Sequence, residues 1–214
     1  MMKSKRSMAE RSKRFVQRDL ERRALKVRNP RKVTAVAYDG RRTEAEYFRG
    51  WQRKLGTIGM VLAPFYVRSG GNALKAVEAC LVQSKSDGPF DEIWCVCDVD
   101  DTKSGDVQKA KALASRESIN LCLSSRCFEV WLALHWCRIS LASLQTEQEA
   151  INLVSQHHSA YSGKSKEVPF EVLFGKTRDA CLHADWLAQQ GLANPATDVH
   201  RLIRKFYNLI AQKK

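Results

Sequence analysis

The sequence predicts an α/β fold: an open, mainly parallel, four-stranded sheet flanked by helices, with a basic arm before it and a helical extension after it. Two observations carry this prediction. Short apolar runs alternate with stretches of helical periodicity between residues 33 and 140, which is the pattern of repeated strand–helix units. The runs are apolar almost throughout, as expected for parallel strands that are buried on both faces.

The apolar runs and the helical spacing place the elements in order. We expect strands at residues 32–38, 60–67, 91–97 and 119–123. We expect the helices that follow them at residues 43–55, 73–84, 106–115 and 128–139. Thr43 is a plausible N-cap of the first helix, and residues 69–72 (SGGN) form the turn that opens the second. Pro64 is expected to break the second strand, because proline has no amide donor.

After residue 140 the pattern is mostly helical. Further helices are predicted at roughly residues 146–158, 175–189 and 197–212. The predicted organisation is a basic, flexible or helical arm at 1–32, an α/β core at 33–140 and a helical extension packed on the core at 141–214.

Most of the formal net charge of +13 lies in the arm. Residues 1–32 hold 13 Lys and Arg against three acidic residues, whereas residues 33–214 hold 23 against 20. Two interpretations are open: a tail that contacts nucleic-acid phosphates, or a solvated, partly helical arm docked on a protein partner. On the first interpretation the candidate contacts are Arg11, Lys13, Arg14, Arg18, Arg22 and Arg23, with Arg41 and Arg42 after the first strand.

Several classes of protein are excluded. The apolar content of 44% argues against wholesale disorder, and no apolar run approaches the roughly 20 residues of a membrane span. The N-terminus is basic but lacks the apolar segment of a secretory signal, and the seven cysteines, an odd number, favour reduced thiols. We therefore expect a soluble, cytoplasmic protein without a membrane partner.

Carboxylates follow two of the predicted strands. Asp39 comes after the first strand, and Asp98, Asp100 and Asp101 come after the third. Because ligands gather at the carboxyl ends of parallel strands, we expect these side chains in one cleft. Their oxygens are hard ligands that suit Mg²⁺ or Mn²⁺ in a phosphoryl-transfer site. The alternative is that they cap turns and the following helix.

Five segments carry a family resemblance through their order along the chain. They are residues 39–48 (DGRRTEAEYF), 70–72 (GGN), 91–101 (DEIWCVCDVDD), 127–135 (CFEVWLALH) and 194–200 (NPATDVH). The acid–Gly pair after the first strand and the later D-x-D resemble a Toprim domain. The five segments together are more closely similar to the RloB-like family of phage-defence proteins. The resemblance extends from about residue 32 to about residue 206 and leaves out the basic arm.

The resemblance implies a Toprim-like fold and a Mg²⁺- or Mn²⁺-dependent nuclease. It implies that Asp98 and Asp100 hold the metal, and that the acid after the first strand is a ligand or a general acid/base. The family usually has Glu where this chain has Asp39, whose carboxylate is one methylene shorter, and such a displacement predicts an attenuated site. Glu44 and Glu129 lie in matching motifs as supporting candidates, the alternative being helix-surface or capping roles.

The resemblance also implies a biological role. It suggests the effector of an anti-phage, abortive-infection system that cleaves RNA, with tRNA as one candidate, or DNA. It suggests an ATPase of the ABC or AAA type as the protein partner.

Two other functions remain open from the sequence. A Toprim-like scaffold with a weakened acid would serve as a nucleic-acid-binding or partner-binding module. Residues 98–102 (DVDDT) also fit the D-x-D-x-T pattern of haloacid-dehalogenase-like phosphatases, with Asp98 as nucleophile and Asp100 as acid/base. Residues 162–165 (SGKS) resemble the end of a P-loop, but His158 stands where that motif requires Gly.

Overall fold

The computed structural model describes residues 31–99, 104–139, 144, 146–191 and 194–213. An open sheet of four strands forms its centre: β1 (Val33–Tyr38), β2 (Val61–Tyr66), β3 (Glu92–Asp98) and β4 (Ile119–Ser124). The strand order is β2-β1-β3-β4, and every neighbouring pair is parallel. The predicted fold class is confirmed, and the arrangement is consistent with a Toprim-like fold.

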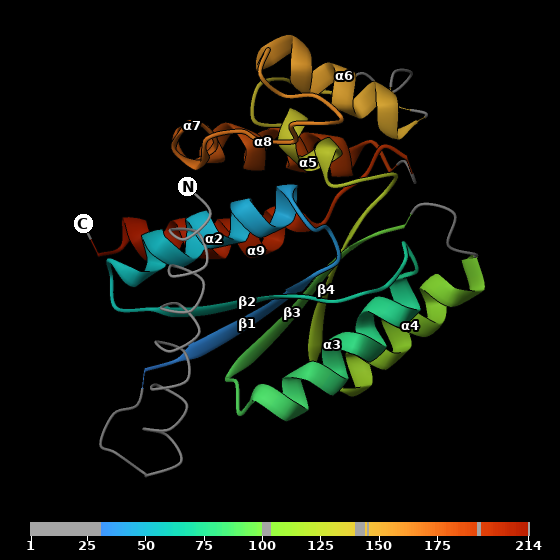
Figure 1. Cartoon of the computed structure of the whole chain (residues 1–214), viewed down its shortest axis with the longest axis vertical. Helices are drawn as coiled ribbons and strands as arrows, with labels where there is room; N and C mark the ends of the chain where they lie inside the picture. Colours follow the sequence, from blue (N-terminus) through green and yellow to red (C-terminus); the bar gives the residue numbers. More distant parts are fainter. Residues whose placement is uncertain (1–30, 100–103, 140–143, 145, 192–193, 214) are drawn as a thin grey trace.

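Helices cover both faces of the sheet (Figure 1). The pair α3 (Ala73–Asp87) and α4 (Ser104–Arg116) covers one face, and the pair α2 (Thr43–Gly56) and α9 (Val199–Ala211) covers the other. The remaining helices lie beyond α2 and α9, away from the sheet. They are α5 (Glu129–Ala133), α6 (Glu147–His157), α7 (Phe170–Gly175) and α8 (Thr177–Gln189).

The outer helices share a hydrophobic core with the sheet. The fully buried ring of Trp51 on α2 contacts Phe170 on α7 and Phe206 on α9, with ring centroids 5.5 Å and 5.7 Å away. The indole Nε1 of Trp131 donates a hydrogen bond of 3.0 Å to the hydroxyl of Tyr47, which joins α5 to α2. Full burial of one large apolar side chain stabilises the folded protein by roughly 1.5–3 kcal/mol. This packing fixes α5 and α7 relative to α2.

Two local predictions in the first strand–helix units are wrong. Pro64 does not break β2, because β2 is an edge strand and Pro64 stays in register with Val36 of β1; a missing amide donor is tolerated at an edge. Thr43 is not an N-cap, because the cap position of α2 is Arg42 and no side chain caps it. The Thr43 hydroxyl lies instead 3.3 Å from the hydroxyl of Tyr161.

One helix prediction in the second half is also wrong, and one helix was not predicted. The helix expected over 128–139 is short, because α5 ends at Ala133 and the following residues form turns. There the ring Nδ1 of His135 lies 3.1 Å from the carbonyl of Leu132 and 3.2 Å from that of Trp131, so the imidazole shares these acceptors with the backbone. The sequence pattern also missed α7, whose six residues are too few to show helical periodicity.

The segment 194–198 lies against the carboxyl end of β4. The Ser125 amide donates to the carbonyl of Ala196 at 2.8 Å, and the Asp198 amide donates to the carbonyl of Leu123 at 2.8 Å. These bonds bring the NPATDVH segment to the same edge of the sheet as the carboxyl ends of the strands. Among the described residues, no helix combines the length and the apolar character needed to cross a bilayer.

Candidate metal centre

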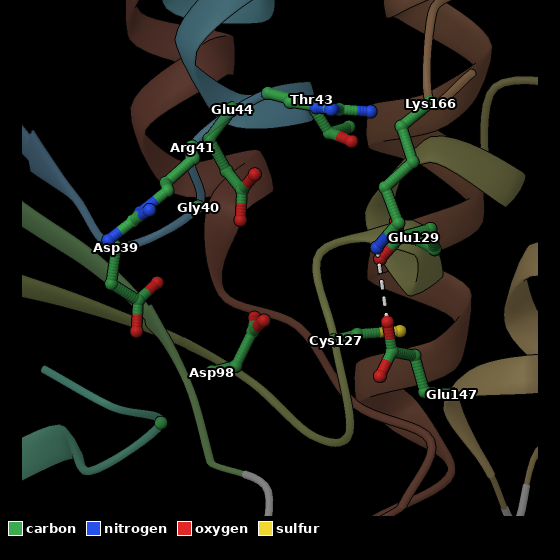
Figure 2. Close-up of a pocket in the computed structure, with 12 residues that line it drawn as sticks. Asp39, Gly40, Arg41, Thr43, Glu44, Asp98, Cys127, Glu129, Glu147 and Lys166 are labelled. Atoms are coloured by element: carbon green, nitrogen blue, oxygen red, sulfur yellow. Dashed lines mark hydrogen bonds and ion pairs between the residues drawn. The ribbon is translucent and has the colours of Figure 1, made fainter. Parts of the chain in front are cut away.

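Three carboxylates converge at the carboxyl edge of the sheet. Asp39 follows β1 and Asp98 ends β3, and these strands are direct neighbours, so the two side chains emerge side by side. Glu44 comes from the first turn of α2. One carboxylate oxygen from each of the three lies within 4.8 Å of the other two. Figure 2 shows the three side chains pointing toward one another. The shorter side chain of Asp39 therefore still reaches the cluster.

Gly40 makes room for Glu44. A Cβ atom at position 40 would lie 1.8 Å from Oε2 of Glu44 and 2.0 Å from its carboxyl carbon. Any side chain at this position would displace the Glu44 carboxylate. The glycine after Asp39 therefore has a structural role in the cluster.

Asp39 is held from the side of β2. Its Oδ2 accepts a hydrogen bond of 2.7 Å from the Ser69 hydroxyl, whose oxygen in turn accepts from the Gly71 amide at 3.1 Å. Burial raises the pKa of Asp39, although the Ser69 hydroxyl and the backbone at Asp39 and Asp98 oppose that rise. The SGGN turn predicted before α3 thus orients the first carboxylate.

Glu44 is a buried residue, with 7% of its surface exposed. The interpretation of Glu44 as a helix-surface residue is therefore wrong. Burial raises its pKa to about 8, and the neighbouring carboxylates of Glu129 and Asp39 add to the rise. Carboxylates this close together are costly, because each loses hydration and repels the others, and the ammonium group of Lys166 only partly opposes the rise in the pKa of Glu44. The three oxygen donors in this place fit a hard divalent cation such as Mg²⁺ or Mn²⁺.

The cluster forms one wall of a cavity of about 370 Å³. Glu129, Glu147 and Lys166 form the opposite wall (Figure 2). Arg41 and Arg42 also line the cavity. Both are exposed.

Glu129 is buried in the opposite wall, with 3% of its surface exposed. Its Oε1 accepts a hydrogen bond of 2.6 Å from the hydroxyl of Tyr161 and lies 3.2 Å from Nζ of Lys166. The interpretation of Glu129 as a surface or capping residue is wrong, because it is buried and no side chain caps α5. Glu129 is not one of the three carboxylates whose oxygens cluster.

A model of the RloB-like protein family matches residues 34–206 of the chain. The chain belongs to the RloB-like protein family. The match begins in β1, ends in α9 and includes all three clustered carboxylates. No curated protein and no solved structure gives a significant match.

The structure of this RloB-like protein brings together part of the predicted site. Asp39 and Asp98 lie together as expected, and Glu44 joins them. Arg41 donates from Nε to the Tyr66 hydroxyl at 3.3 Å. Arg42 donates from Nη1 to the carbonyl of Lys164 at 2.7 Å. The other predicted site residues lie outside the described residues: Asp100, Asp101, Arg11, Lys13, Arg14, Arg18, Arg22 and Arg23.

Sequence reasoning did not select Lys166, which lines the opposite wall of the cavity in this RloB-like protein, or Tyr161, whose hydroxyl donates to Glu129 in that wall. Both come from the segment between α6 and α7. The nearest sequence pattern to these two residues is SGKS at 162–165, which resembles the end of a nucleotide-binding loop and does not point to a metal site. A residue in a connection between two helices shows no helical periodicity and does not follow a strand, so neither pattern identifies it as a site residue.

Proposed function

We propose that this RloB-like protein is a Mg²⁺- or Mn²⁺-dependent nuclease that hydrolyses phosphodiester bonds of RNA or DNA. The convergence of Asp39, Glu44 and Asp98 at the carboxyl edge of a parallel sheet supports this proposal most strongly. These three residues would hold the cation. Asp100 and Asp101, which follow β3 outside the described residues, are further candidate ligands.

The residues of the chain have separable tasks in this reaction. A bound divalent cation supplies Lewis acidity at the phosphate and favours ionisation of water. Ser69 fixes the orientation of the Asp39 carboxylate, and Gly40 leaves the space that Glu44 needs. In the overall hydrolysis the oxygen of water bonds to phosphorus and one phosphorus–oxygen ester bond breaks. One proton of water ends on the leaving oxygen, and the other is released from the new phosphate group.

The biological role that we propose rests on family membership. The protein acts as the effector of an anti-phage defence system in the cytoplasm. Its activity is controlled by an ATPase of the ABC or AAA type. RNA, with tRNA as one candidate, or DNA is the substrate.

The proposal is tested by measuring cleavage of RNA and of DNA with Mg²⁺ or Mn²⁺. Asp98→Asn and Glu44→Gln should each lower the rate at least about 100-fold, because each removes one charged ligand from the cluster. Asp179→Asn, at an exposed position on α8, is the matched control and should cleave like the unmodified protein. Unchanged cleavage in both cluster variants would refute the proposed site. Nucleic-acid binding without any cleavage by the unmodified protein would favour the binding-module function.

A further inference from the structure

A turn at residues 160–166, next to the cavity, is closed by its own polar groups. The Ser165 hydroxyl donates to the carbonyl of Ala160 at 2.6 Å, and the Ser165 amide donates to the Ser162 hydroxyl at 3.1 Å. The amide of Lys166 donates to the carbonyl of Ser162 at 2.9 Å. These bonds determine where the chain emerges from the turn, and therefore where the side chain of Lys166 begins.

The turn is also fixed to the metal-site side of the cavity. Arg42, directly before α2, donates a hydrogen bond of 2.7 Å to the carbonyl of Lys164. Lys166 has a φ of 38°, in the left-handed region that residues with a Cβ atom seldom adopt. Such a conformation persists where the surrounding contacts over-determine it, and it is common at functional sites.

Lys166 extends into the cavity from the wall that faces the three-carboxylate cluster (Figure 2). Its Nζ lies 3.2 Å from Oε1 of Glu129 and 3.1 Å from Oε1 of Glu147, and its side chain is 25% exposed. An ammonium group has three donor hydrogens, and these two contacts use two of them. With respect to the residues that the structure describes, one donor therefore remains for a ligand in the cavity.

The cavity is rich in carboxylates, so a phosphate that enters it needs a positively charged group on the wall opposite the three-carboxylate cluster. The described residues that line the cavity include five carboxylates, from Asp39, Glu44, Asp98, Glu129 and Glu147, against three cations, Arg41, Arg42 and Lys166. A phosphodiester carries a negative charge, and more charge develops on its non-bridging oxygens as water adds to phosphorus. Donors that are already in position stabilise such charge strongly, because they need no reorganisation during the reaction. A cation at the cluster neutralises only one side of the phosphate.

We propose that Lys166 is a catalytic residue of this nuclease, whose ammonium group binds a non-bridging oxygen of the scissile phosphate opposite the metal cluster. This inference rests on the proposed function. Burial lowers the pKa of Lys166, but the carboxylates of Glu129 and Glu147 outweigh burial and raise the pKa above its ordinary value. The ammonium group therefore stays charged near neutral pH. The two glutamates hold it in position until the phosphate arrives.

The test uses the full chain and a small phosphodiester, bis(4-nitrophenyl) phosphate, which has no base for the arm or the surface to recognise. Three quantities are measured for each variant: the Mn²⁺ dissociation constant, kcat/KM for the probe with Mn²⁺, and the affinity for inorganic phosphate in the presence of Ca²⁺. Lys166→Met should leave Mn²⁺ affinity within about threefold of the unmodified protein, lower kcat/KM about 100-fold and weaken phosphate binding about tenfold. Lys166→Arg should restore most of the phosphate affinity.

Lys54→Met is the matched control, because Lys54 also pairs with a glutamate, Glu171, and its side chain is 32% exposed. Lys54 does not line the cavity, and its variant should behave like the unmodified protein. Lys166→Gln, which keeps a donor toward Glu129, replaces Lys166→Met if the latter does not fold. Equal phosphate affinity and equal kcat/KM in the Lys166 and Lys54 variants would overturn the role of Lys166 while leaving the nuclease proposal intact. Absence of Mn²⁺ binding by the unmodified protein would overturn both proposals.

Discussion

Glu44 occupies its place in the cluster because residue 40 has no side chain. The carboxylate of Glu44 lies over the Cα of Gly40, in space that a Cβ atom would fill. An Asp-Gly pair is also common in turns. The sequence alone therefore did not show whether the glycine serves the turn or leaves space for a metal-binding carboxylate. In the structure Gly40 does not have a positive φ, so what requires a glycine here is the space occupied by Glu44.

Gly40→Ala should therefore weaken metal binding without removing any carboxylate. We expect the Mn²⁺ dissociation constant to rise at least tenfold, because the displaced Glu44 no longer faces Asp39 and Asp98. Gly56→Ala, at the end of α2 where an added Cβ meets nothing within 4 Å, is the control. Mn²⁺ binding by Gly40→Ala that equals binding by Gly56→Ala would contradict this explanation.

At the residue scale, the sequence revealed the carboxylates at strand ends but not the residues on the opposite wall. Asp39 and Asp98 were predictable because parallel strands place their carboxyl ends at one edge. Glu44 was only a supporting candidate, since helical spacing does not say how the first turn of α2 lies over the strand end. Lys166 was not predictable, because it is brought to the cavity by a turn between two outer helices.

The short helix α5 and the turns after it form the most deeply buried part of the outer layer. His135 is 1% exposed, and its Nε2 has no hydrogen-bond partner among the described residues. Burial lowers the pKa of His135 to about 4, although the carbonyls of Trp131 and Leu132 oppose this effect. The imidazole is therefore neutral in the folded protein at neutral pH.

The buried histidine should make folding stability depend on pH. Because its folded pKa lies below its ordinary value of about 6.5, the stability is fully present above pH 6.5 and is lost as pH falls toward 4. Between pH 7 and pH 4.5, the free energy of unfolding should fall by on the order of 2 kcal/mol more in the unmodified protein than in His135→Leu. Urea unfolding at several pH values measures this difference, with His158→Asn as the control. Parallel pH profiles for the unmodified protein and His135→Leu would count against it.

At the element scale, strands were predicted more securely than helices of the outer layer. Each strand is a continuous apolar run between turn residues, so its position follows from composition alone. In the turn after α5 the ring of His135 lies against helical carbonyls, and α7 packs Phe170 against Trp51. Such tertiary effects leave no periodic pattern in the sequence.

Across the whole molecule, basic residues are concentrated before residue 33 of the sequence, whereas carboxylates are concentrated at the cavity. Residues 1–32 hold 13 Lys and Arg against three acidic residues, and residues 33–214 are nearly balanced. Carboxylates facing a phosphate repel it unless cations lie between them. If the protein is the nuclease that we propose, this distribution of charge predicts binding of nucleic acid by the arm and cleavage at the sheet edge.

Removal of residues 1–30 should separate these two functions. We expect weaker binding of RNA and DNA and a shallower dependence of log affinity on log salt concentration, because fewer counterions are released from phosphates. Hydrolysis of bis(4-nitrophenyl) phosphate should remain within about threefold of the full chain, since the probe is too small to need the arm. A salt dependence that is the same with and without these residues would show that the arm is not the main contact.

If Asp39, Glu44 and Asp98 form one divalent-metal site, anomalous diffraction from a crystal soaked with Mn²⁺ should locate the ion among them. We expect an anomalous peak at the carboxyl edge of the sheet, within coordination distance of a carboxylate oxygen from each of the three residues. A crystal with no peak at this edge, and with the three side chains turned away from one another, would contradict the claim.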